Sequence, residues 1–200
     1  MQYHPITDSF KLITQQRELL KQPEFKYIYP SLDSYLTAME DQGVSARRDL
    51  DILLSYLINV IGNAKGTQTR FRNEAERYML FCWTEKHKSV LKSNVEDVRD
   101  YIDWLWSPPK ALIADNTIAS RYKAKGDSDV RLVNEAWRPF VLRGAKANRK
   151  TNKFISPERA KLAKPKQAYS LNQTSLQNSY ASLNVFFKEL WETELISRNP

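Results

Sequence analysis

The sequence predicts an all-α protein. Apolar residues recur at three- and four-residue spacings in most windows, which is the period of helices that turn one side to a core. The chain holds only five Gly and few alternating Val-rich runs, so a protein built mainly of sheet is not expected. Its 200 residues, 42% of them hydrophobic, suit one domain or one core with a smaller appended unit.

Three helices are expected in the first part of the chain, residues 1–62. They are Phe10–Leu20, a helix from Ser31 to about Gln42, and Ala46–Ile61, in which Leu residues recur on one side. We expect this part to form an N-terminal arm and a helical lead-in, with residues 1–30 as an arm or a loosely docked lead-in. Residues 63–200 are expected to form the second unit.

A strong amphipathic helix is expected over Thr69–Trp83, with Thr69 as its cap. At 100° per residue, its bulky side carries Phe71, Ala75, Tyr78 and Cys82. The opposite side is polar and carries Arg70, Asn73, Arg77 and Thr84.

The next helix, Val95–Trp106, has clear ends. Acidic residues follow Asn94 in the first turn, where they favour a helix start, and Pro108 ends the helix. Residues 107–168 lack a convincing period, apart from a short helix expected near Asp129–Ala136.

The last long helix is expected over Thr174–Trp191. Its core wall consists of bulky residues: Leu176, Tyr180, Leu183, Phe187, Leu190 and Trp191. Its far wall is small and mostly uncharged: Thr174, Gln177, Asn178, Ala181, Ser182, Val185 and Lys188. Side chains of this kind can approach base edges in a DNA major groove, whereas a merely solvated face usually carries Glu and Lys. An ordinary surface face is the alternative.

Positive charge is concentrated in one block. Arg121 through Lys166 contains 14 Lys or Arg and four Asp or Glu, a net charge of +10, which leaves the rest of the chain at −2. Such a block indicates a polyanionic partner. A solvated loop is the alternative explanation.

The sequence gives no reason to expect catalysis, a metal or a cofactor. His4 and His87 are the only histidines, and neither has a Cys or His neighbour at metal-ligand spacing. Gly-rich phosphate loops and a Ser/His/Asp or Cys/His set are not found. No apolar run approaches the ~18 residues of a membrane span, so we expect a cytoplasmic protein without a membrane partner.

Four motifs, in order, resemble the core-binding region of tyrosine recombinases, the phage-integrase family. Thr69–Trp83 resembles the first helix of that region, and Val95–Ile102 resembles its second helix. Asn134–Val141 is similar to an N-P-x-W-R-P-F-V element of one bacterial subgroup, with Glu135 where that subgroup has Pro. Tyr169–Pro200 resembles the closing helix, which ends in Asn-Pro before the catalytic domain.

The resemblance implies a fold and a function for this chain. The fold would be an orthogonal helical bundle (SAM-like core-binding domain) with an extra N-terminal helical segment and a long basic insertion at about residues 107–168. The function would be that of the DNA-binding N-terminal part of a site-specific integrase, which clamps double-stranded DNA at the recombination core site. The catalytic Arg, Lys and Tyr would lie beyond residue 200. The full-length protein would self-associate on DNA as a tetramer and would be nucleoid-associated.

The residues expected to contact DNA fall in three groups. The first helix would supply Arg70, Asn73 and Arg77. The basic block would contact phosphates through Arg143, Lys146, Arg149, Lys150, Lys153, Lys164 and Lys166. The last helix would supply Thr174, Gln177, Asn178 and Ser182. Such a two-helix interface requires that both polar flanks be exposed on one surface. Alternatively, Arg70 and Arg77 could form ordinary helical pairs with the nearby Glu74 and Glu76.

Two other functions fit the same sequence. A stand-alone helical DNA-binding regulator would need a compact helix-turn-helix of ~20 residues, whereas the two candidate faces lie about a hundred residues apart. A helical protein–protein adaptor would use the basic block to bind an acidic partner. Salt-sensitive binding to arbitrary duplex DNA would separate the adaptor from both DNA-binding functions.

Overall fold

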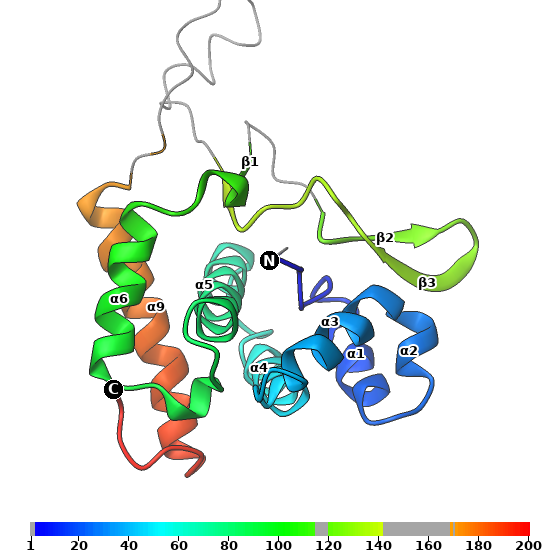
Figure 1. The fold of residues 1–200 in the computed structure, drawn as a ribbon, viewed down its shortest axis with the longest axis horizontal. Coiled ribbons are helices and arrows are strands. Elements are labelled where there is room, and N and C mark those ends of the chain that lie inside the picture. Colours follow the sequence, from blue (N-terminus) through cyan, green and yellow to red (C-terminus); the bar gives the residue numbers. More distant parts are fainter. Residues whose placement is uncertain (1–2, 115–119, 142–168, 170) are drawn as a thin grey trace, which may run out of the picture.

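The structure, a computed structural model, describes residues 3–114, 120–141, 169 and 171–200 (Figure 1). It is mostly helical, as predicted. The α-helices are α1 (Ile13–Leu20), α2 (Phe25–Ile28), α3 (Pro30–Glu40), α4 (Ala46–Asn59), α5 (Lys65–Thr84), α6 (Val95–Trp106) and α9 (Gln173–Glu192). Two short 3₁₀ turns, Val90–Lys92 and Lys110–Leu112, flank α6.

The prediction of an all-α protein is wrong in one region. Strands β2 (Tyr122–Lys125) and β3 (Ser128–Val133) form an antiparallel hairpin, and β1 (Ile113–Ala114) pairs in parallel with β4 (Phe140–Val141). The helix expected near Asp129–Ala136 is therefore wrong, because residues 129–133 belong to β3 and the next three form a turn. Gly126, with a φ of +57°, supplies the left-handed turn residue that a tight hairpin needs.

Helix ends with a side-chain cap agree closely with the sequence. The α6 helix has the predicted bounds, because the Asn94 side chain accepts a hydrogen bond from the Asp97 amide and the Asp97 carboxylate accepts one from the Asn94 amide. Asn172 caps α9 with a single hydrogen bond, which its side-chain oxygen accepts from the Ser175 amide at 2.7 Å. Thr69, by contrast, does not cap α5, which begins four residues earlier at Lys65.

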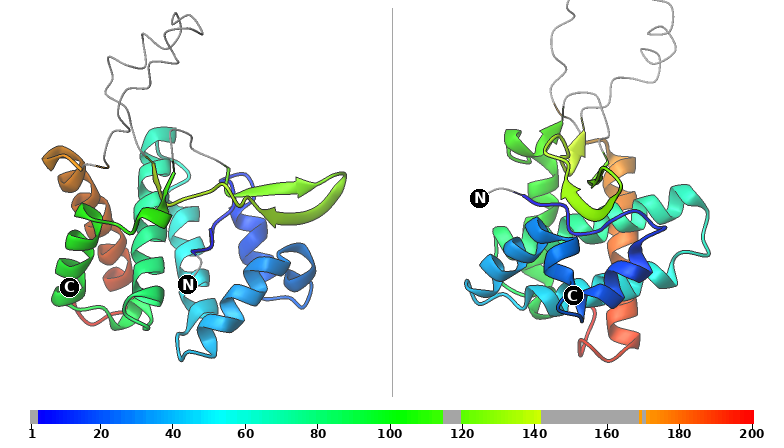
Figure 2. Two further views of the ribbon diagram at one scale, coloured as in Figure 1. Left: turned by 45° about the horizontal axis from the view of Figure 1, so that its top comes forward. Right: turned by 90° about the vertical axis from the view of Figure 1, so that its right-hand side faces the viewer.

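Helix α5 is the centre of the fold. It contacts α4 on one side and α6 and α9 on the other (Figures 1 and 2). Tyr78 meets the ring of Tyr101 from α6 at 5.0 Å and the ring of Phe187 from α9 at 5.2 Å. From Glu74 to Thr84 every α5 residue except Arg77 is buried. Five consecutive apolar residues, Met79 to Trp83, cover its whole circumference, so this half of the helix has no solvent face.

The N-terminal residues are not a loosely docked arm. Pro5, Ile6, Thr7 and Asp8 are buried, and one buried core cluster runs from Ile6 to Leu190 across the expected unit boundary at residue 62. Helix α1 packs against α4, and the hairpin lies beside α2 and α3 (Figure 1).

The buried residues of α9 lie on a different side of the helix from the predicted one. At 100° per residue, the centres of the two sides are about 60° apart around the helix axis. Tyr180 and Trp191 were expected in the core, but they are 57% and 52% exposed. Ser179, Ser182 and Phe186 are buried in their place. The two serines are small, so they let α9 pack closely against the core.

Candidate nucleic-acid interface

The first half of α9 presents a polar face to solvent. Thr174, Gln177 and Asn178 are exposed, and so is Ala181 one turn further on. No Asp or Glu occurs between Arg159 and Lys188, so no negative charge of this segment opposes a polyanion. These three predicted contact residues therefore lie where a ligand can reach them.

Ser182 does not belong to this face. It is only 2% exposed, and its hydroxyl donates to the Asn178 carbonyl oxygen at 2.7 Å. The predicted contact between Ser182 and DNA is wrong, because the true buried wall of α9 includes this residue.

Helix α5 contributes less to the surface than predicted. Arg70 is exposed, with its guanidinium carbon 5.5 Å from the centre of the Phe71 ring. Asn73 is half-buried, and its side-chain oxygen accepts a hydrogen bond from Arg121 Nη2 at 2.8 Å. Of the three predicted α5 contacts, Arg70 alone is both exposed and outside the internal polar network.

Arg77 is held inside the protein. Its side chain is 18% exposed, its Nη2 lies 3.4 Å from Glu74 Oε2, and its guanidinium lies 5.2 Å from the centre of the Phe140 ring. The helical pair with Glu74, which was the alternative reading, is thus confirmed. The expected two-helix interface is therefore wrong for Arg77, because the polar side of α5 is not exposed to solvent after Asn73.

The residues of the basic block that are expected to contact phosphates lie outside the described residues. These are Arg143, Lys146, Arg149, Lys150, Lys153, Lys164 and Lys166. The described chain flanks them at Val141 and at Tyr169, and Tyr169 donates a hydrogen bond to the Leu105 carbonyl oxygen at 3.2 Å.

A buried polar network next to α5 was not foreseen from the sequence. Glu76 is 1% exposed, and its Oε1 accepts hydrogen bonds from the amides of Ile6 and Thr7, both at 3.0 Å. Its Oε2 accepts one from Arg121 Nε at 2.7 Å. Burial alone would raise the pKa of Glu76, but the guanidinium groups of Arg121 and Arg72 keep it below its ordinary value.

The spacing of residues along α5 does indicate that Glu76 is buried. Leu80 and Trp83 lie four and seven residues after Glu76, so the glutamate shares their apolar stripe. A carboxylate at such a position needs a buried partner. The partners lie in distant parts of the chain, and for that reason the sequence pattern did not identify them.

His4 makes the stability of the folded protein depend on pH. Its ring stacks on Tyr35 at 5.2 Å, it also meets the ring of Tyr122, and its buried Nε2 has no hydrogen-bond partner. Burial lowers the pKa of His4 to about 4, against the opposing influence of the Pro5 carbonyl and Glu76. Since the unfolded histidine has a pKa of about 6.5, it takes up a proton first as the pH falls, and stability falls with it.

We expect His4 to cost the protein about 2 kcal/mol of stability between pH 7 and pH 5. His4→Phe keeps the stacked ring without the titrating group, so its unfolding free energy should fall less over this interval than that of the wild type. Urea unfolding at both pH values measures the difference. His87→Asn, which changes the exposed histidine, should behave like wild type. An equal loss in His4→Phe and wild type would contradict this account.

The described part of the chain has no group of His, Cys, Asp and Glu side chains placed to hold a metal ion. Its helices also include none with the length and apolar character required to cross a bilayer. No protein-family model, curated protein or solved structure matches this chain.

Proposed function

We propose that this chain binds duplex DNA through the first half of α9, together with basic residues of the 142–168 segment. The observation that carries the proposal is the exposed, acid-free polar face formed by Thr174, Gln177 and Asn178. The 142–168 segment supports it with nine Lys or Arg and one Glu, a net charge of +8, because phosphate neutralisation supplies a large share of the affinity of proteins for DNA.

The chemistry of the α9 face suits base reading. The amides of Gln177 and Asn178 each offer a donor and an acceptor, which match the N6 and N7 groups of adenine in the major groove. Ala181 is small, so the helix can approach the base edges closely. Positive charge from the basic segment would fix the helix against the phosphates.

The proposal includes a place in a larger enzyme. The four motifs resemble the core-binding region of tyrosine recombinases, so we propose that this chain forms the N-terminal half of a clamp around DNA. A catalytic half would cleave one strand by attack of a tyrosine on phosphate and would exchange strands without ATP or metal. In this proposal the protein is nucleoid-associated and self-associates on DNA.

Gln177→Ala and Asn178→Ala should each change the preference between DNA sequences. A lost base contact should cost roughly 1–3 kcal/mol on the preferred site and little on other duplexes. Fluorescence anisotropy with a selected site and a scrambled duplex measures both. Gln15→Ala, which removes an exposed amide from α1, is the matched control and should alter neither affinity.

Equal weakening on both duplexes would show that α9 contacts the backbone and does not read bases. If both variants bound the two duplexes as wild type does, α9 would not be the recognition helix.

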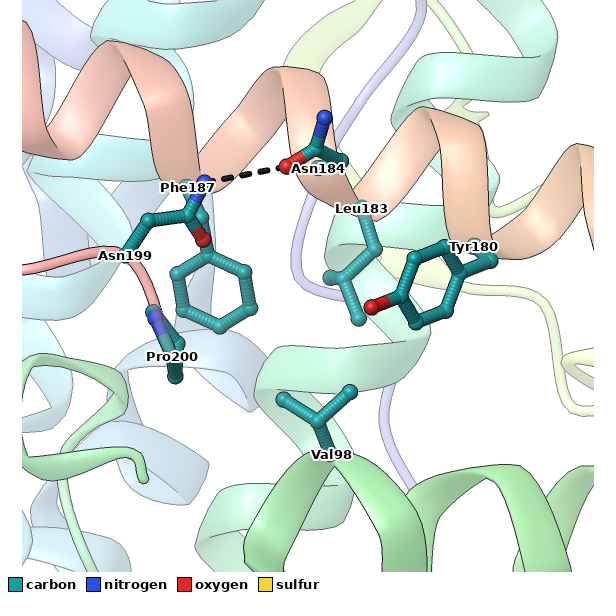
Figure 3. A pocket seen from close by; sticks show the side chains of 7 residues that line it. All are labelled: Val98, Tyr180, Leu183, Asn184, Phe187, Asn199 and Pro200. Atoms are coloured by element: carbon teal, nitrogen blue, oxygen red, sulfur yellow. Dashed lines mark hydrogen bonds between the residues drawn. The ribbon is translucent and has the colours of Figure 1, made fainter. Parts of the chain in front are cut away.

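Two exposed aromatic side chains of α9, Tyr180 and Trp191, favour a second candidate function, a helical protein–protein adaptor. Figure 3 shows Val98 of α6 facing Tyr180, Leu183 and Phe187 of α9, with Pro200 beside them. Tyr180 and Trp191 are both more than half exposed. An adaptor of this kind would not bind arbitrary duplex DNA in a salt-sensitive way, and Tyr180→Ala would abolish its binding to a protein partner.

A further inference from the structure

The β2–β3 hairpin has little core of its own. Tyr122 is its one fully buried side chain, and residues 123–129 and Leu132 are exposed. An isolated two-stranded hairpin is at best marginally stable in water. Contacts with the rest of the protein must therefore hold it in place.

Three side chains at the base of the hairpin make these contacts through polar groups. Arg131 of β3 forms a bidentate ion pair with Asp8, in which Nε lies 2.7 Å from Oδ2 and Nη2 lies 2.9 Å from Oδ1. Tyr122 of β2 donates a hydrogen bond to the Pro5 carbonyl oxygen. Arg121, directly before β2, pairs with Glu76. The β3 strand also lies against α2 and α3.

Two of these contacts are made to residues 5–8, which we call the strap, and the third is made to Glu76 of α5, which itself binds the strap. Pro5 and Asp8 belong to it, and Glu76 is the carboxylate whose other oxygen binds the strap amides of Ile6 and Thr7. Gln16 of α1 fixes the strap from its other side, because it accepts from the Asp8 amide and donates to the Ile6 carbonyl oxygen, both at 2.9 Å. The strap thus lies between α5, α1 and the hairpin.

The Asp8 carboxylate is the centre of this arrangement. It is 3% exposed and accepts hydrogen bonds from Arg131, from the Tyr29 hydroxyl at 3.1 Å and from the Ser9 amide at 2.6 Å. Tyr29 also meets the Tyr122 ring edge-on at 5.5 Å. A buried ion pair of this kind is costly to break from one side, since the remaining charge is left without a partner.

We propose that the strap is a conformational device on which the order of the hairpin depends, so that releasing residues 5–8 frees the hairpin while the helical core stays folded. The helices do not need the strap in the same way. The contacts of α5 with α4, α6 and α9 include aromatic and aliphatic side chains, such as Tyr78 of α5 against Phe187 of α9 at 5.2 Å. The proposal concerns the fold alone and does not require that the chain bind DNA.

Hydrogen exchange of the full chain, read by mass spectrometry, tests the proposal. Asp8→Asn removes the charge that holds Arg131, and amide exchange over residues 121–133 should speed up by about tenfold or more. Exchange in α4 and α9 should stay as in wild type. Asp51→Asn is the matched control, because it neutralises a carboxylate that pairs with Arg17 and Lys21 elsewhere on the surface; it should leave hairpin exchange unchanged.

The coupling must also work in reverse. Arg131→Gln changes a half-buried hairpin residue and should speed up exchange of the Ile6, Thr7 and Asp8 amides, again without effect on α9. Two results would overturn the proposal. Hairpin exchange in Asp8→Asn could equal that of wild type, or Arg131→Gln could alter the strap amides only together with those of α4 and α9.

Discussion

Glu76→Gln should lower the free energy of unfolding by about 3–5 kcal/mol, the usual cost of removing one partner from a buried ion pair. Glutamine keeps the shape of the side chain and can still accept from the Ile6 and Thr7 amides. Its amide group, however, meets the guanidinium of Arg121, which lies 2.7 Å from the present carboxylate oxygen and is only 11% exposed. Two donors then face each other, and Arg121 loses its counter-charge.

Urea unfolding followed by circular dichroism at pH 7 measures this loss, which corresponds to a fall in Tm of roughly 10 °C for a chain of this size. Asp51→Asn serves again as the control, because its carboxylate is 32% exposed and such pairs contribute at most about 1 kcal/mol. If the two variants were equally stable, the network around Glu76 would not be the anchor described here.

The pH dependence of this variant has a defined sign. The pKa of Glu76 lies below its ordinary value in the folded protein, so the carboxylate contributes stability at neutral pH and loses it as the pH falls through the folded pKa. Wild type and Glu76→Gln should therefore converge in acid.

Local patterns predicted the elements whose ends are set by neighbouring residues. The start of α6 follows from the capping box of Asn94 and Asp97, two residues only three positions apart, and its end follows from the nearby Pro108. The hairpin had a local signal as well, since Gly126 separates two short runs, but the basic composition of the region obscured it.

The helical period of apolar residues alone could not show which sides of α5 and α9 are buried. The apolar run Met79 to Trp83 has no polar side, so the face that remains open is decided by how many neighbours surround the helix. In α9 the small residues Ser179 and Ser182 are buried, and Tyr180 stays outside. A prediction that turns every bulky residue towards the core places Tyr180 inside and Ser182 outside.

The N-terminal strap was missed for a different reason. Ile6 and Thr7 bind a carboxylate about 70 positions away, at Glu76, and Asp8 binds Arg131, 123 positions away. No pattern within a short window contains such a pair. These contacts decide both where the N-terminus lies and how the hairpin is held.

A change in three basic residues should have the largest effect on the proposed function. Lys146→Ala, Arg149→Ala and Lys150→Ala together should weaken binding to any duplex about a hundredfold at 0.15 M salt. Each phosphate contact contributes a slope of about −0.9 to the logarithmic salt dependence, so three lost contacts flatten it by about 2.7. The affinities of variant and wild type should then converge towards 1 M salt, where counterion release no longer favours binding.

The effect must be separated from that of net charge. The matched control replaces Lys11, Lys21 and Lys26 by Ala, which removes the same charge from exposed positions near α1 and α2. Anisotropy titrations over a salt series should give this control nearly the wild-type slope, because screened charges act over only ~8 Å at physiological ionic strength. If the first triple variant bound duplex DNA as well as wild type at moderate salt, the basic segment would not contact phosphate. If both triple variants weakened equally, attraction by overall charge would replace a defined contact surface as the explanation.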